Sequence, residues 1–187
     1  MIESNMIKII LLLLHLSLSV FAYDKVTIPN KGLSHESKKN LESISKYAIK
    51  IGTGTLHKTY IFIDPMCPFS KKYIAKLTKN KMAQALNSYY IFLYKLPKFK
   101  SNKVSQFIYQ SKNKSDALKS IMIDNKNIDL NMTKEDKDIQ ALIDEIARVG
   151  EKLKVKQRPY IMSFEKGSIY CTVSSGSAPC LEELNFN

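Results

Sequence analysis

The stretch Ile63-Asp-Pro-Met-Cys-Pro-Phe-Ser-Lys-Lys-Tyr73 decides the fold of this 187-residue chain, because it marks the passage from a strand to a helix. Residues 59–63 form a short apolar run of β-branched and aromatic side chains, which is typical of a strand buried on both faces. Asp-Pro ends that strand, and Pro68 suits the first turn of a helix, where its missing N–H costs nothing. The pattern therefore predicts that Cys67 stands at the start of a helix.

Further elements follow on both sides of this stretch. A strand–helix–strand unit implies two parallel strands joined by a right-handed crossover, and two short runs around a glycine-containing turn predict a β-hairpin. We therefore expect an α/β fold, with a mixed four-stranded sheet, helices on its faces and a helical insertion over about residues 98–153. The expected helices are 36–50, 68–86, 103–123 and 139–153, and the expected strands are 59–63, 89–94, 160–164 and 168–173.

The composition is that of an ordinary globular protein, with 44% hydrophobic and 25% charged residues. The net charge of +12 comes almost wholly from lysine, since Arg148 and Arg158 are the only arginines. Proteins that read nucleic-acid sequence depend on arginine for bidentate contacts, whereas these lysines are scattered. We expect a solvated basic surface and no nucleic-acid partner; attraction to anionic lipid headgroups or acidic partners is the alternative.

The N-terminal segment predicts export. Residues 9–21 form an apolar run after Lys8 that is too short for a membrane span, and Val20-Phe21-Ala22 provides a cleavage site after Ala22. We therefore expect residues 1–22 to be a secretory signal, residues 23–56 an N-terminal arm and helix, and residues 57–187 the main domain. The alternative is an uncleaved amphipathic or membrane anchor.

Export changes what the three cysteines mean, because disulfides persist outside the cytosol. An odd number leaves one thiol over. We favour a disulfide between Cys171 and Cys180, which lie nine positions apart around a flexible serine-rich stretch; the alternative is that one of them approaches Cys67 as a resolving thiol. No C-x-x-C pair exists, and His35 and His57 are far from any cysteine pair in the sequence, so no zinc site is expected. No cofactor is expected either.

The position of Cys67 predicts a reactive thiol. A helix N-terminus offers free N–H groups and the positive end of the helix dipole, and both favour the nucleophilic thiolate. Pro68 and Phe69 would hold the turn, and Ser70 could face the same sulfur. Arg158-Pro159 stands just before the third strand, where a cis proline could abut the helix start. The alternative is a buried, inert cysteine.

With these residues in view, the chain resembles the thioredoxin fold and, more closely, the catalytic domain of the periplasmic disulfide isomerases DsbC and DsbG. The resemblance spans about residues 45–175. Its motifs are Asp64-Pro-Met-Cys-Pro-Phe-Ser-Lys-Lys72, Tyr94-Lys-Leu-Pro97 and Leu153-Lys-Val-Lys-Gln-Arg-Pro-Tyr-Ile161. The chain departs from the family where Ser70 replaces the second cysteine and where Arg158 replaces the usual threonine. Residues 23–56 are also too short for the family's dimerisation domain.

The resemblance implies that Cys67, Ser70 and Pro159 form the catalytic site, with Pro68, Phe69, Arg158 and Pro159 binding substrate. Without a second cysteine, Cys67 can form a mixed disulfide but cannot resolve it. The first hypothesis is therefore a periplasmic monothiol exchange protein, isomerase- or chaperone-like, acting on cysteine-containing exported proteins. Another substrate thiol, a small thiol or a membrane redox partner would release the product. Arg158 would contact an acidic substrate, steady the Cys67 thiolate or lie exposed on the surface.

The second hypothesis is a non-catalytic binding module of an envelope or secretion assembly, because fold does not fix function. An exposed, acidic Cys67 thiol would favour exchange chemistry, and a buried, ordinary one would favour the binding module. Two other motifs have simpler structural interpretations: Gly52-Thr-Gly54 predicts a turn rather than a phosphate loop, and Asp64 predicts a turn into the helix rather than a proton relay.

Overall fold

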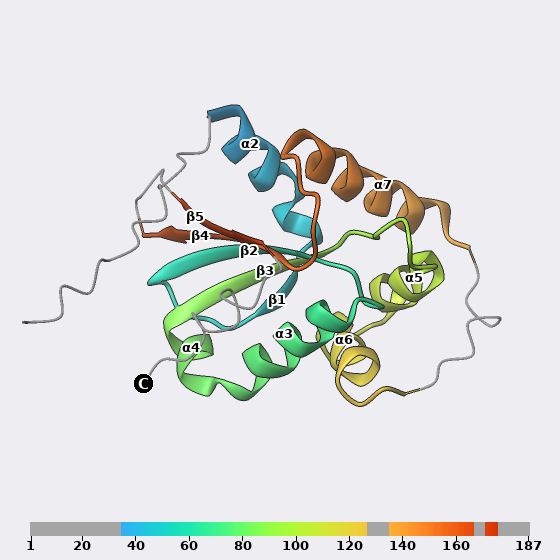
Figure 1. Cartoon of the computed structure of the whole chain (residues 1–187), viewed down its shortest axis with the longest axis horizontal. Helices are drawn as coiled ribbons and strands as arrows, with labels where there is room; N and C mark the ends of the chain where they lie inside the picture. Colours follow the sequence, from blue (N-terminus) through green and yellow to red (C-terminus); the bar gives the residue numbers. More distant parts are fainter. Residues whose placement is uncertain (1–34, 127–134, 167–170, 176–187) are drawn as a thin grey trace, which may run out of the picture.

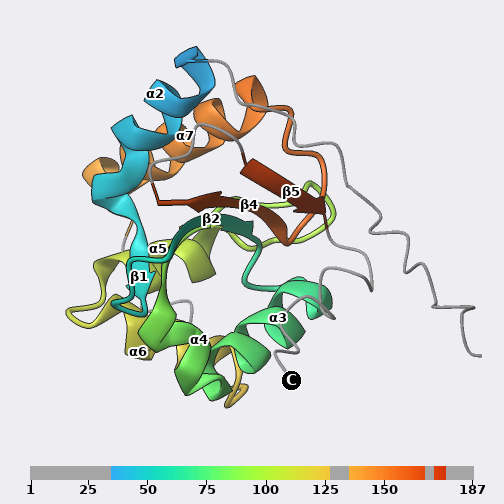
Figure 2. The same ribbon diagram turned by 90° about the vertical axis from the view of Figure 1, so that its left-hand side faces the viewer.

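The computed structural model describes residues 35–126, 135–166 and 171–175. A mixed β-sheet lies between two layers of helices (Figure 1). Helices α2 (His35–Ile44) and α7 (Lys137–Lys152) cover one face, while α3 (Pro68–Lys79), α4 (Lys81–Leu86) and α6 (Lys114–Met122) lie on the other, as a view from the side also shows (Figure 2). Helix α5 (Asn102–Gln110) contacts both α6 and α7.

The sheet confirms the expected mixed α/β architecture and adds one strand to it. Its order is β1-β3-β2-β4-β5, with β2 and β3 parallel and every other neighbouring pair antiparallel. The strands are β1 (Ile49–Ile51), β2 (His57–Ile63), β3 (Asn87–Leu93), β4 (Tyr160–Glu165) and β5 (Cys171–Ser175). The parallel β2–α3–α4–β3 unit and the β4–β5 hairpin are the units that the sequence predicts.

The additional strand corrects the expected helix over residues 36–50. That helix ends at Ile44, and the single 3-10 turn η1 (Ser45–Tyr47) leads into β1. Ile49 and Ile51 are buried and Lys50 between them is exposed, the alternation of a strand with one buried face. Three residues give too short an alternation to outweigh the helical spacing before them, so the edge strand becomes apparent only from its pairing with β3.

Two other expected helices are each divided at an asparagine. The expected helix 68–86 breaks at Asn80, whose side chain accepts a hydrogen bond of 2.9 Å from the Ala83 amide and caps α4. The expected helix 103–123 breaks in the same way at Asn113, whose side chain accepts from the Asp116 amide and caps α6. Asparagine is a strong N-cap because its side-chain oxygen competes for backbone N–H groups, and periodicity alone does not register this.

The turn expected at Gly52-Thr-Gly54 is present and packs tightly. Gly52 has a φ of +79°, a conformation that L side chains rarely adopt. A Cβ atom at Gly54 would collide with the backbone of Leu86 and Asn87. The amide of Thr53 donates to the Gln84 carbonyl at 3.0 Å, so this turn joins β1 to β2 directly against the end of α4.

Aromatic side chains dominate one face of the sheet and aliphatic side chains the other. The Phe92 ring contacts those of Tyr60 and Phe62, and Tyr60 stands on the face covered by α2, since it lines a cavity together with Lys38 and Glu42 of that helix. Ile61 and Ile63, which alternate with these aromatic residues along β2, are fully buried on the opposite face of the sheet, which α3 and α6 cover.

In the described ranges no helix is long and apolar enough to cross a membrane. The expected secretory signal lies outside the described residues.

Candidate active site

Cys67 lies where β2 turns into α3, as the sequence predicts. It is the N-cap residue of α3, and Pro68 is the first residue of the helix. The Cys67 amide donates to the Asp64 carbonyl at 3.0 Å, and the Cys67 carbonyl accepts from the Lys71 amide at 3.0 Å. These two bonds fix the turn from both sides and place the cysteine side chain beside the first amides of the helix.

The loop before β4 closes over the sulfur. The Arg158–Pro159 peptide bond is cis, and the Cys67 thiol donates to the Arg158 carbonyl with an Sγ–O distance of 3.7 Å. Cys67 is only 2% exposed. Residues 91 positions apart thus meet at one sulfur atom. The thiol is buried rather than exposed, which is one of the two properties expected of the binding module; low reactivity of the thiol is the other.

The residues next to this buried sulfur are exposed and apolar. Met66 is 41% and Phe69 58% exposed, and Pro68 between Cys67 and Phe69 is also exposed. Exposed large apolar side chains that gather in one place are typical of surfaces that bind other molecules. Met66, Pro68 and Phe69 therefore form a small exposed apolar surface beside Cys67, which we call the apolar collar.

Asp64 anchors the turn and is fully buried. Its Oδ1 accepts from the Met66 amide at 2.8 Å, which is the role in the turn that the sequence predicts. Its Oδ2 accepts from the Leu96 amide and from the Ser101 hydroxyl. Sequence reasoning missed these last two contacts, because nothing local connects residue 64 with a loop more than 30 residues away.

Ser70, which stands where the resembled family has its second cysteine, is also fully buried. Its hydroxyl oxygen accepts a hydrogen bond of 3.3 Å from the Asp64 amide. The serine therefore ties the first turn of α3 back to the end of β2.

Arg158 is buried, which corrects the alternative that it lies exposed on the surface. Its guanidinium stacks 3.6 Å from the centre of the Tyr94 ring. Nε donates to the Tyr94 carbonyl at 2.8 Å, and the terminal nitrogens donate to the carbonyls of Val155, Gln157 and Lys95. Burial lowers the pKa of this side chain, while the nearby Tyr94, Asp64 and Cys67 oppose that change. Because these donors bind backbone, Arg158 fixes the loop that carries its own carbonyl to Cys67.

Of the two cysteines expected to form a disulfide, the structure describes only the backbone of Cys171. Cys171 begins β5, while Cys180 lies outside the described residues, so their disulfide stays a prediction. Within the ranges that the structure describes, no group of three or more His, Cys, Asp or Glu side chains is arranged to hold a metal ion.

Comparison with known proteins gives a structural likeness. No family model and no curated protein matches the chain. A disulfide interchange protein from Neisseria gonorrhoeae superposes with a TM-score of 0.57 at 21% identity, over 75% of this chain and 94% of the other. The fold is thioredoxin-like. DsbG from Helicobacter pylori matches with a TM-score of 0.54 at 20% identity, over 69% of this chain and 62% of its own.

A third similar structure is the catalytic domain of Proteus mirabilis ScsC, with a TM-score of 0.54 at 13% identity, over 80% of this chain and 94% of that domain. The expected thioredoxin-like α/β fold is therefore confirmed. Identities of this size support the fold alone, so the chemistry of the site has to be argued from this chain's own residues.

Proposed function

We propose that this chain is a thiol–disulfide exchange protein whose nucleophile is Cys67. The observation that carries the proposal is the meeting of the Cys67 sulfur, the start of α3 and the Arg158–Pro159 loop at one point of a thioredoxin-like fold. The three similar structures named above include a disulfide interchange protein and DsbG, which is consistent with this chemistry.

The start of α3 and Arg158 bring positive charge near Cys67, while the buried Asp64 carboxylate lies in the same turn. The first turn of α3 contains no acidic residue, and its free amides point towards the N-cap position. The buried Arg158 guanidinium is near enough to interact electrostatically with Cys67. Positive surroundings of this kind stabilise a thiolate relative to a thiol.

The reaction that we propose is a balanced exchange. The Cys67 thiolate attacks one sulfur of a substrate disulfide, the substrate S–S bond breaks, and its second sulfur leaves as a thiolate while a mixed disulfide forms with Cys67. A different thiolate of the same substrate then attacks the substrate sulfur of the mixed disulfide. That step releases the Cys67 thiolate, and the net result is isomerisation without an external oxidant or reductant.

The serine at position 70 restricts the exchange reactions that Cys67 can complete by itself. A serine oxygen cannot form a disulfide, and this one already accepts the Asp64 amide, so the mixed disulfide has no resolving thiol at that position. We therefore propose an isomerase- or chaperone-like role on cysteine-containing proteins that are exported with this chain to the periplasm. The apolar collar of Met66, Pro68 and Phe69 would bind the unfolded parts of such substrates.

The test is the refolding of a protein with scrambled disulfides, followed by recovery of its activity. We expect the Cys67→Ser variant to isomerise at least 100-fold more slowly than the wild type, because the hydroxyl is isosteric but not nucleophilic. Lys103→Ala, on the exposed side of α5, is the matched control and should behave as the wild type. Full activity of Cys67→Ser would contradict the proposal.

A Ser70→Cys variant tests the monothiol mechanism separately. It would supply the missing resolving thiol, and we expect it to gain dithiol reduction of insulin disulfides by at least tenfold over the wild type. A wild-type protein that already reduces insulin at the rate of the variant would contradict a monothiol mechanism.

One observation favours a second function, a non-catalytic binding module. Cys67 is almost completely buried, whereas Met66 and Phe69 beside it are exposed and could bind a partner without any chemistry. Alkylation across pH 4–9 distinguishes the two functions: rapid modification of Cys67 well below the ordinary thiol pKa of about 8.5 supports exchange, and an unreactive Cys67 supports the binding module.

A further inference from the structure

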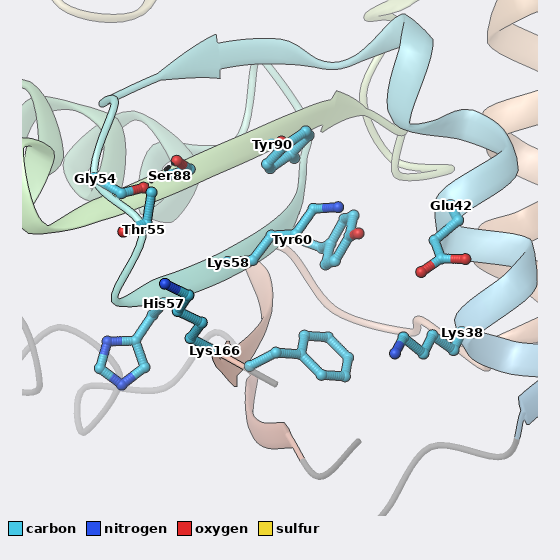
Figure 3. A pocket seen from close by; sticks show the side chains of 11 residues that line it. Lys38, Glu42, Gly54, Thr55, His57, Lys58, Tyr60, Ser88, Tyr90 and Lys166 are labelled. Atoms are coloured by element: carbon cyan, nitrogen blue, oxygen red, sulfur yellow. Dashed lines mark hydrogen bonds between the residues drawn. The ribbon is translucent and has the colours of Figure 1, made fainter. Parts of the chain in front are cut away.

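A concave site lies at the opposite end of β2 from Cys67. It is a cavity of about 410 Å³, a size typical of small-molecule sites. Its lining comes from α2, from the turn before β2 and from strands β2, β3 and β4, as Figure 3 shows. The seven residues of β2 place it on the order of 20 Å from the active site at about 3.3 Å per residue, so it is a separate site.

The register of three strands builds the floor of this cavity. Lys58 pairs with Ser88 on β3 and with Phe164 on β4, and Tyr60 pairs with Tyr90. Because these positions are directly opposite or two residues apart, all five side chains stand on the same face of the sheet. The Phe164 ring meets the Tyr60 ring edge-on at 5.7 Å, and the Tyr90 ring lies 5.3 Å from it. The floor is therefore aromatic.

The rim carries an excess of positive charge. Lys38 and Glu42, one turn apart on α2, face Lys58 across the cavity, and Lys166 stands on the β4 side (Figure 3). The lining thus contributes three ammonium groups and one carboxylate. In the described part of the chain, the ion pairs within 4 Å involve none of these three lysines.

Lys58 links the floor to the rim. Its ammonium lies 5.1 Å from the centre of the Tyr60 ring and 4.8 Å from that of Tyr90. Burial lowers the pKa of this lysine, but its hydrogen bond to Tyr60 and the charges of Tyr60, Tyr90 and Glu42 outweigh the burial and leave the pKa raised. A charged ammonium is therefore held at the aromatic floor, where an incoming anion would meet it.

We propose that this cavity binds a small aromatic anion, a ring that carries a phosphate or carboxylate group. On binding, the Lys58 ammonium would move from the Tyr60 and Tyr90 rings to the anionic group, together with Lys38 or Lys166, and the ligand ring would take its place on the aromatic floor. The two halves of the ligand match the two halves of the cavity. Neither a neutral aromatic molecule nor a bare anion satisfies both, so the aromatic anion should bind more tightly than either part.

The test is a titration of the purified ¹⁵N-labelled protein with phenyl phosphate, followed by amide chemical shifts. We expect saturable shifts at residues 54–60, 88–90 and 164–166. Inorganic phosphate and phenol should each bind at least tenfold more weakly, and benzylamine should not bind because its ammonium repels the rim. Equal binding of inorganic phosphate, or shifts spread over lysines on every face, would overturn the proposal.

Variants assign the effect to the cavity. Lys58→Met should weaken phenyl phosphate binding at least tenfold, Lys58→Arg should retain it within threefold, and the exposed Lys103→Met should leave it unchanged. If Lys58→Met lowers the unfolding temperature, Lys38→Ser replaces it, because Lys38 is a half-buried residue of α2; a threefold loss is then expected. Unchanged binding in both lysine variants would overturn the proposal.

Discussion

The two ends of strand β2 differ in how their polar groups are satisfied. At the end that leads to Cys67, the side chains of Asp64, Ser70 and Arg158 are all buried, and each is hydrogen-bonded to backbone. At the other end, Lys58 and Lys38 are only half-buried around a cavity, and neither forms an ion pair within 4 Å among the described residues.

This difference shows two uses of charge within one fold. A buried group that binds fixed backbone holds a geometry, and removing it leaves its partners unsatisfied in a dry environment. A half-exposed lysine keeps much of its hydration, so its removal costs little and its charge remains available to a ligand. We therefore expect the Cys67 end to govern stability and the cavity end to govern binding.

Replacing Asp64 should break the Cys67 end most severely. Asp64→Ala removes the acceptor of the Met66 and Leu96 amides and of the Ser101 hydroxyl. We expect the free energy of unfolding in urea to fall by about 3 to 5 kcal/mol, because three donors lose a partner that is itself fully buried. Asp124→Ala is the control, since that side chain is exposed at the end of α6. A loss at Asp64 as small as that at Asp124 would refute the anchoring role.

The chain's only two arginines provide the next comparison. Arg158→Met keeps the apolar stem but removes the donors to four backbone carbonyls and the contact with Tyr94. We expect a loss of about 2 to 4 kcal/mol in urea unfolding, together with a changed rate of Cys67 alkylation, because the loop that covers the sulfur loses its anchor. Arg148→Met removes only an exposed pair with Glu145 and should change neither quantity. If the two substitutions lowered the free energy of unfolding equally, the burial of Arg158 would add nothing to stability beyond an exposed arginine.

The smallest effect is expected at the cavity end. Lys58→Met retains the apolar part of the side chain and loses only the ammonium contacts with Tyr60 and Tyr90. The free energy of unfolding should change by less than about 1 kcal/mol, and Cys67 alkylation should be unaffected. If Lys58→Met lowered the free energy of unfolding as much as Arg158→Met, both ends of β2 would contribute equally to stability, and the proposed difference between them would be wrong.

Local sequence was sufficient for much of this fold. The apolar run of β2, the Asp-Pro that ends it and the proline that begins α3 are contiguous signals, and they placed Cys67 at the N-cap. The same reasoning gave the strand–helix–strand order and the hairpin of β4 and β5. It missed β1 and the breaks at Asn80 and Asn113, because side-chain capping and edge pairing compete with helical spacing in ways that the spacing does not reveal.

The sequence by itself determined the order of elements, the position of Cys67 at the start of a helix and the serine three residues after it, since each depends on neighbouring residues. Only the tertiary structure decided that Cys67 is buried beneath the Arg158 carbonyl, that Asp64 holds a loop from residues 96 to 101, and that Lys58 meets two tyrosines and a helix at a cavity. Each of these contacts joins residues more than 25 positions apart or depends on strand register. Such distances are closed by packing of the whole sheet, which no local pattern specifies.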